Sequence, residues 1–246
     1  MDRRKFILLS SSLITTPAFA SIKTSNDIFV PDFYKKTFYS LHKKLYMLQH
    51  IVGYANFNLL SFDEALSLAK RYSKIGAFTQ KEIDFIEYLF YSPGEHFGFL
   101  GERTVNKLSH KINKKDTVKI PRTGHYVFKG ESLIIYNKMI KDVDNIYLTS
   151  GIRGVVKQLK LFVGKIYRTN LNISKAAFSI APPGYSYHTI SDFDVGKRGW
   201  GYKNFTSKFA KTKEFFEIRH LNYVGIRYRR DNHYGVRFEP WHIKVI

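Results

Sequence analysis

Apolar and polar residues follow a helical spacing through most of the first half of the chain. Ser61, with Glu64 three residues later, forms a capping box that predicts the start of a helix, and we expect Gly76 to end it. Thr79 and Glu82 form a second capping box. The simplest arrangement that satisfies both signals is a pair of antiparallel helices.

A turn signal and a lysine-rich stretch end this helical pattern. Residues 91–94 read Tyr-Ser-Pro-Gly, which cannot continue a helix, and residues 111–119 are rich in lysine. We interpret the second stretch as a solvated connector and place a domain boundary there. The sequence then divides into a helical N-terminal region over 21–115 and a second domain over 116–246.

The second domain alternates between helical and strand patterns. Helices are predicted over 131–140, 155–167 and 208–220, and strands over 145–149, 176–180, 191–195, 223–228 and 236 to the C-terminus. This mixture predicts an α+β fold: a small, mostly antiparallel sheet with flanking helices, preceded by the helical N-terminal region. We expect the N-terminal region to pack on this domain and narrow its cleft, because its apolar surface cannot remain in water.

The first twenty residues have the composition of an export signal. A positive start at Arg3, Arg4 and Lys5 precedes an apolar stretch, and Ala18-Phe19-Ala20 is a small-x-small cleavage signal. The arginine pair also resembles a twin-arginine signal, so both general and twin-arginine export stay open. Either route predicts a periplasmic or cell-envelope-associated protein.

Charge and cysteine content narrow the choice of partners and sites. The chain carries a formal net charge of +20 and no cysteine, so disulfides and thiolate metal sites are excluded. Outside the cytoplasm, an anionic cell-envelope surface is an expected partner for such a chain. Nucleic acid is not expected, because the basic residues are dispersed and no recognition motif accompanies them.

Two segments near the C-terminus contain the side chains of a catalytic zinc site. One reads Ser186-Tyr187-His188 and continues to Asp194, and the other ends in Glu239-Pro240-Trp241-His242. Together they offer two imidazoles, a carboxylate and a further glutamate, which suits three protein ligands, one open position and a general base. Hydrolysis is therefore the first functional hypothesis.

A third segment precedes these two: Ser150-Gly151-Ile152-Arg153, with Gln158 a turn further on. In this order, the three segments resemble the signatures of VanY-type D-alanyl-D-alanine carboxypeptidases. That family is related to lysostaphin-type peptidases and the hedgehog domain. The resemblance covers roughly residues 132–246, and Glu-Pro-Trp-His is its most specific element.

The resemblance implies a role for each matching residue. His188, Asp194 and His242 would bind Zn²⁺, Glu239 would be the general base, and Arg153 would face the substrate. An arginine fork can hold a terminal carboxylate or stabilise a developing oxyanion.

Two further residues of the matching segments, Gln158 and Ser186, would contact the substrate. The remaining histidines, His125 among them, are interpreted as structural or surface residues, although residues 123–126 could also line a substrate cleft.

The chain departs from the family pattern between the histidine and the aspartate. A one-residue deletion is needed to align Asp194, and Ser191 and Phe193 stand where small residues are expected. Asp192 points to the same strand face as Asp194 and is the rival ligand. Glu239 and His242 are three residues apart, so we expect a bulge or edge position at Pro240 to bring them together.

The functional prediction is an exported zinc metallopeptidase acting on peptidoglycan stem peptides, in the first place a D-alanyl-D-alanine carboxypeptidase. An endopeptidase of the same fold and a cell-wall binding module without catalysis are the alternatives.

Overall fold

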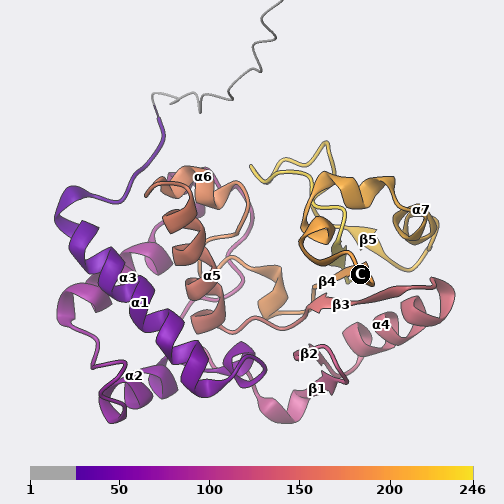
Figure 1. Cartoon of the computed structure of the whole chain (residues 1–246). Coiled ribbons are helices and arrows are strands. Elements are labelled where there is room, and N and C mark those ends of the chain that lie inside the picture. The colour runs from indigo at the N-terminus through magenta and orange to yellow at the C-terminus, as the bar shows by residue number, and fades with distance from the viewer. Residues whose placement is uncertain (1–25, 246) are drawn as a thin grey trace, which may run out of the picture.

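The computed structural model describes residues 26–245, and Figure 1 shows the arrangement of their helices and strands. The longer elements are α1 (Lys35–Val52), α2 (Phe62–Arg71), α3 (Gln80–Tyr91), β1 (Thr117–Ile120), β2 (His125–Phe128), α4 (Glu131–Asp142), β3 (Ile146–Ser150), α5 (Val155–Arg168), α6 (Ile173–Ala177), β4 (Phe193–Lys197), α7 (Lys213–Arg219), β5 (Gly225–Ile226) and β6 (His242–Lys244). The predicted export signal over 1–20 lies outside the described residues. No helix within 26–245 is long and apolar enough to cross a membrane.

Both predicted capping boxes are present. The Ser61 hydroxyl accepts from the Glu64 amide at the start of α2, and Thr79 does the same for Glu82 at the start of α3. The Glu82 carboxylate also accepts hydrogen bonds from Ser40 and Lys44 on α1. This buried carboxylate therefore ties α3 to α1, a third helix that the sequence analysis did not delimit.

Helix α5 joins the N-terminal region to the rest of the molecule. Its apolar face, which includes Leu159, Phe162 and Val163, lies in one hydrophobic cluster with residues of α1, α2 and α3. Figure 1 shows these four helices together with α6 on one side of the molecule. The N-terminal region thus packs on the second half as expected, and α5 is the element it packs against.

A four-stranded antiparallel sheet with the order β3-β4-β6-β5 forms the other side of the molecule. Phe193, Val195 and Ile243 of its central strands lie in a second hydrophobic cluster with residues of α4 and α7. A separate hairpin pairs β1 with β2. The expected α+β class, with a small antiparallel sheet after a helical region, is confirmed.

Two predicted elements differ from the structure. Residues 176–180, predicted as a strand, instead contain the end of the short helix α6 and the turn after it, and the Asn172 side chain caps the N-terminus of α6 by accepting from the Lys175 amide. The helix predicted over 208–220 is interrupted at Thr212, whose hydroxyl caps α7 and accepts from the Phe215 amide.

Other predicted boundaries are displaced. Helix α2 ends at Arg71, so Gly76 does not end it and lies instead in the following turn. The lysine-rich connector contains the start of strand β1. The predicted strands over 223–228 and from 236 onward shorten to β5 and β6, and the strand predicted over 191–195 begins only at Phe193, in β4.

Candidate metal centre

The pairing of β4 with β6 places two predicted ligands side by side. Asp194 and His242 are direct partners in this antiparallel register, as are Phe193 and Ile243. Since side chains alternate along a strand, Phe193 and Ile243 point into the core while Asp194 and His242 point to the opposite face. Apolar patterning on one face of the sheet therefore brings the two polar side chains together on the other.

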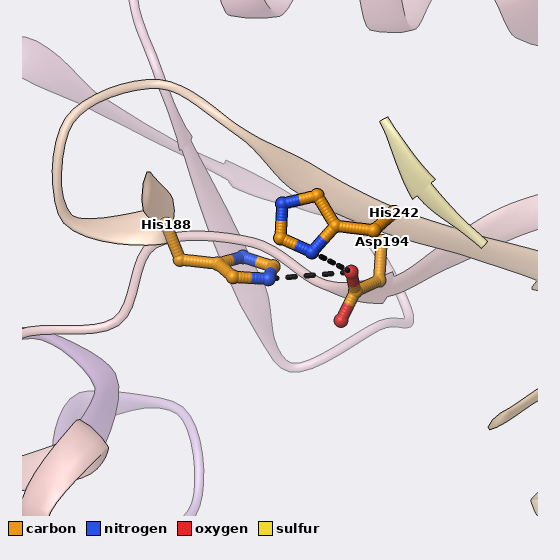
Figure 2. Close-up of side chains that lie close together, drawn as sticks. All are labelled: His188, Asp194 and His242. Carbon is orange, nitrogen blue, oxygen red and sulfur yellow. Dashed lines mark ion pairs between the residues drawn. The ribbon is translucent and has the colours of Figure 1, made fainter. Parts of the chain in front are cut away.

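His188 reaches the same point from a short 3-10 turn, Tyr187–Thr189, that precedes β4. Figure 2 shows its ring pointing toward Asp194, with the His242 ring next to it and directed at the same carboxylate oxygen. His188 Nε2 lies 3.2 Å from Asp194 Oδ1, and His242 Nδ1 lies 3.4 Å from the same oxygen. All three predicted ligands are buried and converge, with one ligand atom from each within 4.8 Å of the others.

These atoms suit a zinc ion. Tetrahedral ligands at about 2.0–2.2 Å from zinc lie about 3.4 Å from one another, close to the two separations above. Within the described part of the chain, His188 Nε2 and Asp194 Oδ1 are buried without a hydrogen-bond partner. Leaving two such atoms unsatisfied costs free energy that coordination of a cation would offset.

Asp192, the rival ligand, is engaged elsewhere. Its Oδ2 accepts from His242 Nε2 at 3.0 Å and from Arg227 Nε at 2.7 Å, and its Oδ1 accepts from Arg227 Nη2 at 2.9 Å. Both oxygens are therefore occupied, and the contact directs Nδ1 of His242 toward Asp194. The geometry favours Asp194 as the ligand and Asp192 as the group that orients His242.

A turn brings Glu239 to this cluster. The His242 amide donates to the Glu239 carbonyl at 3.1 Å, with Pro240 at the second position, where proline is favoured. Glu239 Oε2 then lies 3.8 Å from His242 Nδ1. The two residues meet through this turn rather than through the bulge or edge position expected, since β6 is a central strand.

Arg153 contacts a predicted ligand directly. Its Nη2 donates to Asp194 Oδ2 at 2.5 Å, and its Nε donates to the Ser150 hydroxyl at 2.9 Å. One edge of the Arg153 guanidinium is thus bonded to Ser150 and to Asp194 Oδ2, and Asp194 Oδ1 is directed at the two histidines. Arg153 also lines the neighbouring cavity, so it stands between the metal cluster and any bound substrate.

Protonation differs between the two histidines. Burial, with Arg153 as a further cause, lowers the pKa of His188 to about 4, so its imidazole is neutral at pH 7. Burial also acts against protonation of His242, but the surrounding carboxylates outweigh it and raise its pKa to about 9. Asp194 is buried as well, yet His188 and Arg153 hold the pKa of its carboxyl below the usual range.

A cavity of about 490 Å³ opens beside the cluster and contains all of the predicted site residues. Gln158 is buried in its wall, where its Nε2 donates to the Ala181 carbonyl at 2.7 Å. Ser186 lies in the wall beside His188. The roles of these residues toward substrate stay predictions.

Sequence reasoning missed several residues of the cavity wall. Tyr54, which follows α1, lines the cavity although it precedes the matching signatures. His125 on β2 lines it as well, in the segment 123–126 for which this alternative was left open. Lys157 of α5 and Tyr228, whose ring packs 4.8 Å from that of His242, line it too. No local spacing pointed to Lys157, because Arg153 precedes α5, which begins only at Val155.

Comparison with known families supports the motifs on which the site was predicted. Residues 134–246 match the family model VanY: D-alanyl-D-alanine carboxypeptidase. The chain is therefore similar to the VanY family over this segment. Its boundaries include every predicted ligand together with Arg153 and Glu239, but exclude Tyr54 and His125. No curated protein sequence matches the chain.

Several solved structures are similar to part of the chain. The LdcB LD-carboxypeptidase is 21% identical, with 55% of this chain and 70% of that one covered and a TM-score of 0.44. VanYB in complex with D-alanine-D-alanine is 17% identical, with coverage of 61% and 86% and a TM-score of 0.43. A mutant of the D,D-pentapeptidase VanY in complex with Zn(II) is 18% identical, with the same coverage and a TM-score of 0.42.

Proposed function

We propose that the chain is a zinc-dependent peptidase that hydrolyses peptidoglycan stem peptides, acting as a D-alanyl-D-alanine carboxypeptidase. The observation that supports this most strongly is the convergence of His188, Asp194 and His242, with Glu239 beside them, on the wall of one cavity. The match of residues 134–246 to the VanY family model supports the substrate class.

His188 Nε2, Asp194 Oδ1 and His242 Nδ1 would hold the ion. Zinc supplies a Lewis acid there and lowers the pKa of a bound water toward about 7. The protein fixes the ligands through a second set of contacts: the Gly151 carbonyl oxygen lies 2.9 Å from His188 Nδ1 and can only accept, so that nitrogen must carry the proton.

Glu239 would be the general base. Its carboxylate lies next to His242 and opens on the cavity, where it can take a proton from the attacking water and pass it to the departing amine. Arg153, held by Ser150 and Asp194, would stabilise the negative charge that develops on the scissile carbonyl oxygen. Gln158 and Ser186 would position the peptide beside these groups.

Digestion of purified stem peptides by the zinc-loaded protein tests this proposal. Release of the terminal D-alanine, identified by mass, is the expected result. Products cut at an internal bond would contradict the carboxypeptidase assignment and indicate an endopeptidase. Absence of hydrolysis by protein shown to contain zinc would contradict the enzyme itself.

Replacement of Glu239 by Gln should lower turnover by about 10²–10⁴-fold, the usual effect of losing a positioned general base. Zinc content and thermal unfolding should stay close to those of the wild type, because Gln has nearly the same shape. Unchanged hydrolysis by the zinc-loaded variant would show that Glu239 is not the base.

Export to the cell envelope completes the proposal, because the stem peptides of peptidoglycan lie outside the cytoplasm. The composition of residues 1–20 supports it. Protein isolated from the envelope should begin at Ser21, as N-terminal mass analysis would show. The high positive charge should also favour retention at an anionic envelope surface, with retention decreasing as salt increases.

A further inference from the structure

One wall of the cavity contains a buried lysine beside two residues from outside the VanY-family segment. Lys157 Nζ lies 4.6 Å from the centre of the Tyr54 ring and 5.9 Å from that of Phe57. The Tyr54 hydroxyl is 3.1 Å from His125 Nε2. Lys157, Tyr54 and His125 all line the cavity that contains the metal cluster, and we refer to them as the lysine wall.

Lys157 has no acidic partner. Its side chain is only 4% exposed, and among the described residues no carboxylate lies within ion-pair distance of Nζ. A buried charge without a partner is costly, since aromatic faces compensate only part of the lost hydration. His125 is also buried, and its Nδ1 has no hydrogen-bond partner in the described part of the chain.

The charges around the cavity leave Lys157 uncompensated. The two carboxylates of the wall, Asp194 and Glu239, are each paired with an arginine, at Arg153 and Arg237 respectively. Bound zinc would add two further positive charges. A substrate that carries a carboxylate would therefore be attracted to this cavity, and Lys157 offers it an unused cation.

Arg153 is poorly placed to bind such a carboxylate in bidentate fashion. Its Nε and Nη2 are already bonded to Ser150 and Asp194, so the edge that usually forms two parallel hydrogen bonds is occupied. Lys157 lies in the first turn of α5, and its ammonium group has three N–H donors to offer.

We propose that Lys157, in the setting of the lysine wall, binds the free terminal carboxylate of the substrate peptide. This inference rests on the proposed peptidase function and moves carboxylate recognition from Arg153 to Lys157. It also gives the N-terminal region a part in specificity, because Tyr54 forms the surface over which the ammonium group lies.

The environment of Lys157 agrees with this role. Burial, followed by the nearby charges of Arg153 and Lys160, lowers its pKa to about 7. The groups that face it are Arg153, Lys160, Tyr54 and neutral His125, whose own pKa is lowered to about 3, mainly by burial. A carboxylate bound at Nζ would offset the positive charges around Lys157 and favour its ammonium form.

A pair of peptides tests the inference: acetylated stem peptides ending in D-alanyl-D-alanine, one with a free carboxylate and one with a terminal amide. The wild-type zinc enzyme should prefer the acid. In Lys157→Met, kcat/KM for the acid should fall about 10- to 100-fold, chiefly through KM, as expected for one lost charge-assisted hydrogen bond. The amide should be affected far less, so the preference collapses.

Two variants act as controls for this comparison. Lys157→Arg keeps the charge and should keep the preference for the acid. Lys141→Met removes an exposed lysine of α4 that does not line the cavity, and should behave as the wild type does. Equal losses on both peptides in Lys157→Met, or an unchanged preference, would overturn the inference.

A binding measurement separates this inference from the proposed function. N-acetyl-D-alanine and N-acetyl-D-alaninamide are titrated into the zinc-loaded full chain and followed by NMR. Tenfold or stronger preference for the acid that disappears in Lys157→Met would support the carboxylate site even if no peptide were hydrolysed. Equal binding of acid and amide by the wild type would overturn it, whatever the enzymatic activity.

Discussion

Single residues beside the predicted metal ligands hold those ligands in position. Asp192 is 2% exposed and accepts three hydrogen bonds from His242 and Arg227, so it fixes the orientation of the imidazole that is paired with Asp194 in the sheet. Groups that orient metal ligands in this way commonly set the affinity of the site.

Asp192→Asn should therefore weaken zinc binding by about 10- to 100-fold, because an amide accepts less strongly from His242 and leaves the Arg227 charge unpaired. Affinity would be measured by competition with a chelator, well below the unfolding temperature of each protein. Asp231→Asn, at an exposed aspartate paired with Arg229, is the matched control and should bind as the wild type does. Undiminished affinity in Asp192→Asn would contradict the orienting role.

Lys157 gives a dependence of stability on pH whose sign can be worked out. Its folded pKa is about 7, below the value of 10.5 for a solvated lysine. Below pH 7 the buried charge lowers the free energy of unfolding by its full amount, because Lys157 is protonated in both states. Between pH 7 and 10.5 this destabilisation decreases, and above pH 10.5 it is absent.

Lys157→Met should therefore stabilise the protein at pH 7, and the gain should shrink as the pH rises toward 10.5. Denaturant unfolding at several pH values measures it, with Lys203→Met at an exposed site as control. A gain that stayed constant across this range would show that the folded pKa of Lys157 is not lowered.

At the scale of elements, the site depends on a close contact between β2 and the loop that follows β3. A Cβ atom at Gly151 would lie 1.9 Å from the Tyr126 carbonyl oxygen, which accepts from the Ile152 amide at 2.7 Å. The same glycine provides the carbonyl that fixes His188 Nδ1. The approach of these two segments therefore sets the position of a predicted ligand.

Gly151→Ala should lower both thermal stability and zinc affinity, because the loop must move away from Tyr126 and carry the Gly151 carbonyl from His188. Gly164→Ala, in the interior of α5 with no neighbour closer than 3.8 Å, is the control and should be neutral or stabilising. If Gly151→Ala bound zinc with the wild-type affinity, the contact would not position His188.

At the scale of the whole molecule, the helical region and the VanY-family segment share one core. Leu48 of α1 is fully buried in the same cluster as Phe162 of α5, and Tyr54, which follows α1, reaches the cavity. The N-terminal region is therefore expected to unfold together with the site rather than as an independent unit. The boundary at 115 and 116 remains a prediction from the sequence.

Leu48→Ala should destabilise the protein by about 2–5 kcal/mol through the cavity it leaves. Calorimetry of the zinc-loaded protein should show one transition, displaced to lower temperature. Leu100→Ala, at a leucine that is 61% exposed, should change it little. Two transitions, of which only one moves, would indicate that the regions unfold independently.

Local signals in the sequence were sufficient to predict many of the helices. The Ser61 and Thr79 capping boxes start helices because each needs only residues within one turn, and the apolar spacing of 155–167 located α5 almost to the residue. Short-range signals failed where two of them competed. The Asn172 side chain caps α6, which extends into the predicted strand. The Thr212 side chain caps α7 and so divides a single predicted helix.

The ordered motifs of the sequence were enough to predict the two imidazoles, the glutamate and the arginine of the site, but they left the choice between Asp194 and Asp192 open. Tertiary structure decided what each of them touches. Strand register paired Asp194 with His242, and a salt bridge to Arg227 drew Asp192 away from the ligand position. Packing of α1 against α5 placed Tyr54 beside Lys157, and the Tyr54 hydroxyl in turn contacts His125 of β2. Such contacts join residues tens of positions apart, and no local pattern records them.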